Sequence, residues 1–255
     1  MPDALGWRKK FAVIAPSTNT IVQPDFDDMR PLGVTNHFSR VSIPDDPVES
    51  DEDFLQLMEN IRGGIDDAVD RVLTCSPDHL VMGMSSETFW GGVKTSVELR
   101  DRVERRSGLA VTMGSDASAA ALRCYGDIKR IGVVTPYWPS GDEMVSRYFE
   151  ESGLEVVRLK GLKAKSPMLI SHVTGDQLKE ALTEVDGPDI DAIIQVGTNL
   201  SMARLAGEAE RWLKKPVIAI NTAIYWYALR SNGIRDVVRG FGSLLENFRD
   251  LPLAT

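Results

Sequence analysis

The sequence predicts an α/β protein built from two pseudo-symmetric halves, each a mainly parallel sheet flanked by helices, with a cleft between the halves. One observation is that apolar runs of strand length alternate along the chain with longer segments of helical spacing. Strands that alternate with helices are typical of βαβ units and parallel sheets. The other is an internal repetition: "FAVIAPSTNT" (residues 11–20) and "IGVVTPYWPS" (residues 131–140) have the same order of apolar, small, proline and polar residues.

The individual elements are predicted from hydrophobic periodicity. Strands are predicted at Phe11–Ala15, His79–Met82, Leu109–Met113, Ile131–Thr135, Leu154–Leu159, Ala192–Val196 and Pro216–Ile220. Helices are predicted at Phe54–Leu73, Val93–Arg106, Glu143–Ser152, Gln177–Glu184 and Met202–Leu213. The acidic stretch from Ile43 to Phe54 is interpreted as a solvated loop that leads into a helix.

The repetition extends over the whole chain. "DHLVMGMSS" from Asp78 matches "DAIIQVGTN" from Asp191, and "GLAVTMGSDASAAAL" resembles "KKPVIAINTAIYWYAL". Three matches in the same order predict an N-terminal α/β half at residues 1–125 and a C-terminal half at 126–255. The C-terminal segment 230–255 is expected to pack back on the first half. Chance similarity among βα units is the alternative.

Composition limits the function classes. The 255 residues carry a formal charge of −8, which argues against nucleic-acid binding because that needs a basic face. No apolar run is long enough to span a membrane, and "MPDALGWRKK" lacks the apolar core of a signal peptide. Two cysteines are too few for a disulfide framework, so we expect a cytoplasmic protein. The three histidines have no metal-ligand spacing, and no glycine-rich nucleotide loop is present.

Polar residues follow several of the predicted strands. Parallel sheets place their chemistry at the carboxyl ends of strands, and helix N-termini there offer unpaired N–H groups to an anion. If the halves face each other, one cleft collects Ser17, Thr18, Asn19, Ser85, Ser86, Tyr137, Thr198 and Asn199. Any single one of these could instead cap a helix. Matched clusters in both halves favour a carboxylate site.

These segments resemble a known family. "APSTNT" is similar to the P-S-x-N-T segment of maleate isomerases, and "VVTPYWPSGDEMV" to their strand that ends in T-P-Y. "LVMGMSSETFWGG" is similar to a stretch of arylmalonate decarboxylase, and "IIQVGTNLSMARL" stands at the second catalytic segment. The chain is therefore identified, by resemblance, as a member of the aspartate/glutamate racemase superfamily, in the branch of maleate isomerase and arylmalonate decarboxylase.

The resemblance implies catalysis without a cofactor or a metal, through stabilisation of an enediolate-like intermediate. It implies that Asn19 binds a substrate carboxylate and that Tyr137 donates a hydrogen bond to it. Ser85 and peptide N–H groups around Met84–Ser86 and Gly197–Thr198 would complete the cradle. The predicted substrate-binding set is Pro16, Ser17, Asn19, Met84, Ser86, Gly197, Thr198 and Asn199, and the predicted catalytic set is Tyr137, Glu87 and Ser85.

The chain departs from this family at its two cysteines. Gly83 or Met84 stands at the first cysteine position and Val196 or Gly197 at the second, and we expect their backbone N–H groups to face the pocket. Cys75 and Cys124 each precede a strand, at the opposite edge of the sheet, and are interpreted as structural. The remaining acid/base candidates at strand ends are Glu87, Asp116 and Tyr137. For Glu87 and Asp116, the alternative is a helix cap or a first-turn charge.

Three functions stay open at this point. The first is a cofactor-independent lyase or isomerase that acts on a small carboxylic acid, with decarboxylation of a malonate-like acid as its leading form. The second is a hydrolase or hydratase that uses Ser85, Ser86 or Thr198 with Glu87. The third is a carboxylate-binding protein without activity. The expected partner is a small carboxylate, with no nucleic acid or membrane, and a homo-oligomer is expected.

Overall fold

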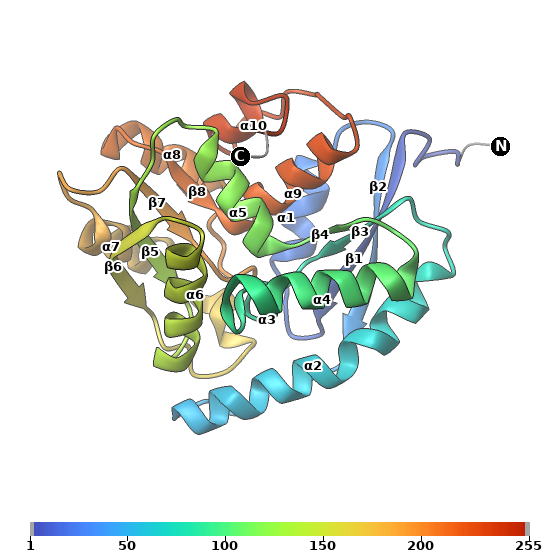
Figure 1. Ribbon diagram of the computed structural model, residues 1–255, viewed down its shortest axis with the longest axis horizontal. Coiled ribbons are helices and arrows are strands. Elements are labelled where there is room, and N and C mark those ends of the chain that lie inside the picture. Colours follow the sequence, from blue (N-terminus) through green and yellow to red (C-terminus); the bar gives the residue numbers. More distant parts are fainter. Residues whose placement is uncertain (1–2, 253–255) are drawn as a thin grey trace.

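The computed structural model describes residues 3–252, which form two four-stranded sheets in which every strand pairing is parallel (Figure 1). The first sheet contains β1 (Lys9–Pro16), β2 (Val34–Val41), β3 (His79–Met82) and β4 (Val111–Thr112), in the order β2-β1-β3-β4. The second contains β5 (Arg130–Thr135), β6 (Glu155–Gly161), β7 (Ala192–Gln195) and β8 (Val217–Ala219), in the order β6-β5-β7-β8. The same strand order occurs twice, which confirms the predicted α/β fold with two similar halves.

Helices connect the strands of both sheets. In the first half they are α1 (Val22–Met29), α2 (Asp51–Leu73), α3 (Ser86–Phe89), α4 (Gly92–Ser107) and α5 (Gly114–Arg123). In the second half they are α6 (Pro139–Glu151), the 3₁₀ turn η1 (Leu169–His172), α7 (Gly175–Val185), α8 (Ala203–Leu213), α9 (Ile220–Ser231) and α10 (Ser243–Asn247). Among the helices of residues 3–252, none is both long and apolar enough to cross a membrane.

Strand β2 and helix α1 are among the elements that were not predicted from the sequence. Strand β2 reads "VTNHFSRV", and five of its eight residues are only partly buried because it lies at a sheet edge beside β1. An edge strand has one neighbour, so its sequence lacks the continuous apolar run of a central parallel strand. Helix α1 has only eight residues, and its buried positions are Val22, Phe26 and Met29. Their spacing is helical, but the segment is too short to give a strong periodic signal.

The segment from Ile43 to Phe54 is not the simple solvated loop that the sequence suggested. Ile43 and Val48 are buried, at 7% and 3% exposure, and the Val48 N–H donates to Lys165 O of the second half at 2.8 Å. Helix α2 already begins at Asp51, where Ser50 and Asp53 form a capping box. This reciprocal pair satisfies two backbone donors and therefore sets the start of the helix.

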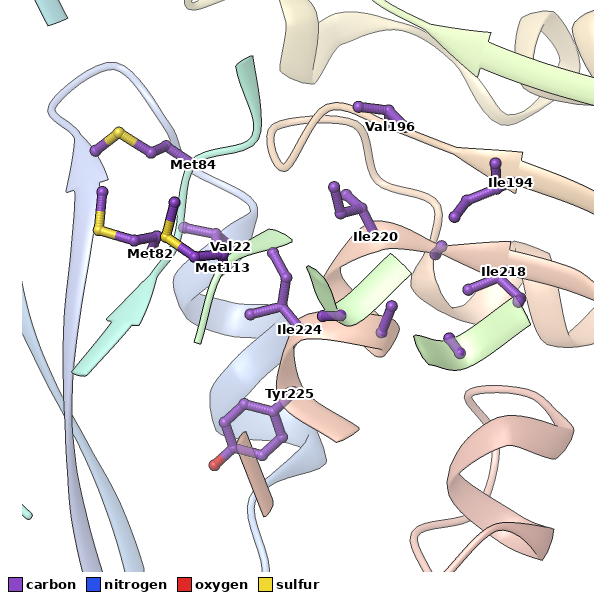
Figure 2. Packing of buried hydrophobic residues seen from close by; sticks show 14 of the residues in the cluster. Val22, Met82, Met84, Met113, Ile194, Val196, Ile218, Ile220, Ile224 and Tyr225 are labelled. Atoms are coloured by element: carbon purple, nitrogen blue, oxygen red, sulfur yellow. The ribbon is translucent and has the colours of Figure 1, made fainter. Parts of the chain in front are cut away.

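Helix α9 lies between the two halves. Its residues pack on α1, α5, β3 and β4 of the first half and on α8 and β8 of the second. Figure 2 shows Ile224 beside Met113, which precedes α5, and Ile220 on the side toward Ile194 and Ile218 of the second sheet. Ile220, Ile224, Tyr225 and Trp226 are fully buried, so α9 is part of a core that both halves share.

Residues near the C-terminus contact the first half. Asp236 accepts two hydrogen bonds from the Arg8 guanidinium, at 2.8 and 2.7 Å, and Ser243 Oγ lies 2.8 Å from Tyr125 OH. Strands β1–β4 precede residue 125 and β5–β8 follow it. The division into domains at residue 125 stays a prediction.

Candidate active site

The site is a small cavity of about 60 Å³ between the halves, at the carboxyl ends of β1, β3, β5 and β7. This is the edge at which the polar clusters were expected to meet. The residues that line it are Pro16, Thr18, Asn19, Ile43, Phe54, Leu57, Met58, Ile61, Met84, Ser85, Ser86, Pro136, Tyr137, Pro167, Ile170, Gly197, Thr198 and Asn199. Nine of the predicted site residues are in this set: Pro16, Asn19, Met84, Ser85, Ser86, Tyr137, Gly197, Thr198 and Asn199.

Thr198 is the point at which the two halves meet. Asn19 Nδ2 donates to Thr198 Oγ1 at 3.0 Å, and Thr198 Oγ1 donates to Gly83 O at 3.2 Å. The Thr198 N–H donates to Ser85 Oγ at 3.2 Å. Ser85 Oγ in turn lies 2.7 Å from Tyr137 OH. One hydrogen-bonded chain therefore runs through Asn19, Thr198, Ser85 and Tyr137, and all four side chains are at least 95% buried.

Local hydrogen bonds hold the other polar groups of the cavity. Asn19 Oδ1 accepts from the N–H groups of Ile21 and Val22 at 3.0 Å each, so Asn19 also stabilises the start of α1. Asn199 crosses between the halves: its Oδ1 accepts from Thr20 N at 3.0 Å, and its Nδ2 donates to Pro167 O at 3.0 Å. The side chains are fixed before any ligand binds.

The expectation about backbone N–H groups is wrong at two of the four positions, and it stays a prediction at the other two. Gly83 N donates to Ile14 O at 2.7 Å and Val196 N to Val134 O at 2.8 Å, because the β3 and β7 ladders extend by one residue. These groups are not available to a ligand. The N–H groups of Met84 and Gly197, one residue further on, have no hydrogen-bond acceptor within residues 3–252. Both residues line the cavity.

Helix α2 supplies an apolar wall to the cavity through Phe54, Leu57, Met58 and Ile61. These four residues were predicted to form the apolar face of a helix but not to take part in the site. The Phe54 ring lies 5.6 Å from the Tyr137 ring, centroid to centroid. No lysine, arginine, histidine or carboxylate is among the residues that line the cavity in the described chain. Any charge in this space therefore comes from the ligand.

Tyr137 is a neutral hydrogen-bond donor at ordinary pH. Burial raises the pKa of its phenol, an effect that hydrogen bonds with Ser85 and Ser86 only partly oppose. A buried phenol loses the hydration that would stabilise its charged form. Tyr137 therefore carries its proton in the ligand-free site.

Three predicted residues lie outside the cavity lining. Ser17 Oγ exchanges hydrogen bonds with the backbone of Ile43 and so joins the loop after β1 to the loop after β2. Asp116 accepts from Arg100 at 2.8 Å and from Tyr148 OH at 3.1 Å, in a separate depression of the surface. Its side chain is therefore not a member of this site.

Glu87 also points away from the cavity. Its Oε1 accepts from Arg62 Nη2 at 2.7 Å and its Oε2 from Arg62 Nε at 3.3 Å, and the side chain is 5% exposed. Burial raises the pKa of Glu87, against the lowering effect of Arg62. This ion pair joins α2 to α3. It leaves the catalytic role that was suggested for Glu87 without geometric support.

Neither cysteine lines the cavity. Cys75 follows α2 and donates to Val72 O, and Cys124 follows α5. Both precede a strand, at the amino edge of their sheets. Burial raises the pKa of the Cys124 thiol to about 11, so this group is protonated at neutral pH. Within residues 3–252, no cluster of histidine, cysteine or carboxylate side chains is arranged to hold a metal ion.

The sequence reasoning assigned no role to several lining residues. Thr18 was expected in the cleft but received no specific role, and Pro136 was considered only as part of the internal repeat. Ile43, Pro167 and Ile170 come from loops that cross over the strand ends. Their contribution depends on how loops that are distant in the sequence meet in space, and a local sequence pattern does not predict such a contact.

Comparison with known proteins gives a consistent result. The family model described as arylmalonate decarboxylase matches residues 56–245, which is more than half of the chain. A comparison with curated protein sequences gives no match.

Solved structures share the fold over nearly the whole chain. A maleate cis-trans isomerase from Nocardia farcinica, bound to TRIS, has 22% identity and a TM-score of 0.84, over 93% of this chain and 98% of that one. The maleate isomerase Iso from Pseudomonas putida S16 has 20% identity and a TM-score of 0.84, over 94% and 98%. A structure of arylmalonate decarboxylase has 20% identity and a TM-score of 0.76, over 92% and 98%.

The family model and the shared fold agree with the sequence motifs and with the cavity at the strand ends. The chain belongs to the arylmalonate decarboxylase family, within the branch of the aspartate/glutamate racemase superfamily that also contains the maleate isomerases.

Proposed function

We propose that the protein is a cofactor-independent lyase that removes one carboxyl group from a small malonate-type acid. The observation that carries this proposal is the division of the cavity into a polar end and an apolar wall, with no thiol at either. The polar end consists of neutral donors around Thr198, Ser85 and Tyr137. The wall consists of four apolar side chains of α2.

In the proposed complex, one carboxylate of the substrate lies in the polar end. The unpaired N–H groups of Met84 and Gly197 and the hydroxyl of Tyr137 are the donors available to it. The second carboxylate then faces the apolar wall, where it loses hydration without gaining a partner. Loss of carbon dioxide moves this charge away from the wall and into the retained carboxylate, so the wall favours the reaction.

When carbon dioxide leaves, the electron pair of the broken bond moves into the retained carboxylate and gives an enediolate. Donors fixed in advance stabilise the oxygen that gains charge. Ser85 Oγ accepts from Thr198 N–H and can donate its own proton to Tyr137, which leaves the Tyr137 hydroxyl free to donate into the cavity. We propose that Tyr137 gives its proton to the α-carbon and regains one from water.

A thiol-dependent reaction is less well supported. The Nocardia farcinica isomerase has been solved as a cysteine-to-serine variant with a covalently bound succinylcysteine intermediate. In the present chain no cysteine lines the cavity. The hydrolase alternative also has less support, because within residues 3–252 Ser85 has no histidine or carboxylate partner that could act as a base.

The test is a screen of substituted malonates, maleate and amino acids in deuterated water, following carbon dioxide and deuterium at the α-carbon. We expect a malonate to give carbon dioxide and an α-deuterated monocarboxylate. The variant Tyr137→Phe should lower kcat at least about a hundredfold, the usual scale for loss of a general acid. The control Tyr148→Phe alters a buried tyrosine that bonds Asp116 outside the cavity, and it should stay near wild type.

Other outcomes would replace the proposal. Conversion of maleate to fumarate would show an isomerase, and α-proton exchange on amino acids would show a racemase. Incorporation of water would show a hydratase or hydrolase. Saturable binding of malonate without turnover would show a carboxylate-binding protein.

A further inference from the structure

We propose that Asn221 and Asp25 form a positioning pair that fixes the Thr198 peptide, and with it the 197–199 loop, for carboxylate binding. Neither residue lines the cavity, and neither was singled out by the sequence motifs. The consequence for catalysis rests on the proposed function. The positional role itself rests on contacts that are present without a ligand.

Both N–H bonds of the Asn221 side-chain amide are used in hydrogen bonds to Thr198 and Asp25. The residue lies in the first turn of α9, where its side chain is 2% exposed. Nδ2 donates to Thr198 O at 3.0 Å and to Asp25 Oδ2 at 2.8 Å. A buried amide with two fixed acceptors has one orientation, so the Thr198 carbonyl has a fixed partner.

Asp25 orients the amide through its charge. A hydrogen bond to a carboxylate is shorter and stronger than one between neutral groups. The pKa of Asp25 is raised to about 6, mainly by burial and to a smaller extent by the nearby charge of Asp28. The Asn221 amide and the Arg204 guanidinium of α8 act in the opposite direction. Asp25 is therefore mostly ionised at neutral pH.

Helix α1 holds Thr198 at two points. Asn19, just before the helix, donates to the Thr198 hydroxyl at 3.0 Å, and the same residue accepts from the first N–H groups of α1. Asp25, one turn into the helix, acts on the Thr198 carbonyl through Asn221. One rigid helix of the first half thus fixes both the side chain and the main chain of a residue in the second.

The internal repeat shows that this carbonyl is held in both halves. Ser85 stands where Thr198 stands in the second half, and its carbonyl accepts from Thr88 Oγ1 at 2.8 Å. In the first half the donor comes from the same short turn. In the second half the corresponding loop contains Gly197 at φ +117°, a backbone conformation that side-chain-bearing residues rarely adopt, and the donor comes from α9.

The test measures amide hydrogen exchange by NMR in the ligand-free protein. Asn221→Ala should speed exchange of the Thr198 N–H at least tenfold, because the loop opens more often. Amides in α4, such as Leu99, should be unchanged. The control Thr222→Val alters the next residue, which is equally buried and whose hydroxyl has no hydrogen-bond partner within the described chain. It should leave Thr198 exchange within about twofold of wild type.

If Asn221→Ala does not fold, two variants of Asp25 test the positional role instead. Asp25→Asn keeps an oxygen that accepts from the Asn221 amide, whereas Asp25→Ala removes it. We expect Thr198 exchange to be at least tenfold faster in Asp25→Ala and close to wild type in Asp25→Asn. Equal exchange at Thr198 in wild type and in every folded variant of Asn221 and Asp25 would overturn the positional role.

Enzymatic turnover of the same variants is measured in a separate experiment. With a malonate that the wild type decarboxylates, Asn221→Ala should lower kcat at least tenfold, while Thr222→Val should not. If the wild type acts on no carboxylate, the proposed function fails, and the exchange result still decides the positional role. Faster exchange with unchanged kcat would overturn the link to catalysis.

Discussion

At the scale of single residues, the site depends on neutral groups that already have partners. Asn19, Ser85, Tyr137 and Thr198 are joined by hydrogen bonds before a ligand binds. The sequence motifs predicted these four residues because each follows a strand and matches a family segment. The same reasoning could not show that Glu87 faces Arg62, since 25 positions separate the two residues and their contact depends on how α2 packs on α3.

Glu87 gives a prediction at this scale. Glu87→Gln should destabilise the protein by about 1–3 kcal/mol, because the half-buried Arg62 loses the buried one of its two charged partners. Decarboxylation should stay within about threefold of wild type, since the side chain does not line the cavity. Urea unfolding and turnover check the two parts.

The matched control is Glu59→Gln, which removes the exposed partner of the same arginine. It should have a much smaller effect on stability, because exposed ion pairs contribute little. A hundredfold loss of turnover in a stable Glu87→Gln protein would return Glu87 to the catalytic set.

At the scale of elements, the structure differs from the sequence prediction where an element has two roles. The apolar stripe of α2 was correctly predicted as a buried helix face, but part of that face is the wall of the cavity. Periodicity reports that a residue is buried, not whether it faces core or ligand. Strand β2 was missed for a related reason, because at the sheet edge only part of it is buried.

The first turn of α6 predicts a pH dependence of stability. Burial raises the pKa of Asp142 to about 7, with Thr135 as its hydrogen-bond donor. In the unfolded chain this carboxyl has its ordinary pKa near 4. The unfolded state therefore releases the proton first, and the contribution of Asp142 to the free energy of unfolding falls as pH rises from about 4 to about 7.

Asp142→Asn should remove this dependence. Relative to wild type, the variant should gain about 4 kcal/mol in free energy of unfolding between pH 4 and pH 8. Urea titrations at several pH values measure the difference. A constant difference across this range would show that Asp142 has the same pKa in both states.

At the scale of the whole molecule, the two halves share one core. Helix α9 packs against both, with Ile224 fully buried beside Met113 (Figure 2). We expect a single unfolding transition, and Ile224→Ala should lower stability by about 3 kcal/mol while keeping that transition single. Tryptophan fluorescence and circular dichroism should coincide during urea unfolding.

The control for this prediction is Leu32→Ala, at a leucine that is 83% exposed, which should change stability little. Two separate transitions in the wild type, or a change confined to one of them in Ile224→Ala, would show that the halves fold independently.

The hydrogen bond from Asn19 to Thr198 has a further consequence during synthesis. These residues are 179 positions apart, and Asn221 follows later still. The first half leaves the ribosome with its strands complete but with only one side of the cavity. Contacts between such distant residues form after local ones, because a long loop must close first. The proposed carboxylate ligand therefore cannot assist the early folding of this chain, and its binding would stabilise only the finished molecule.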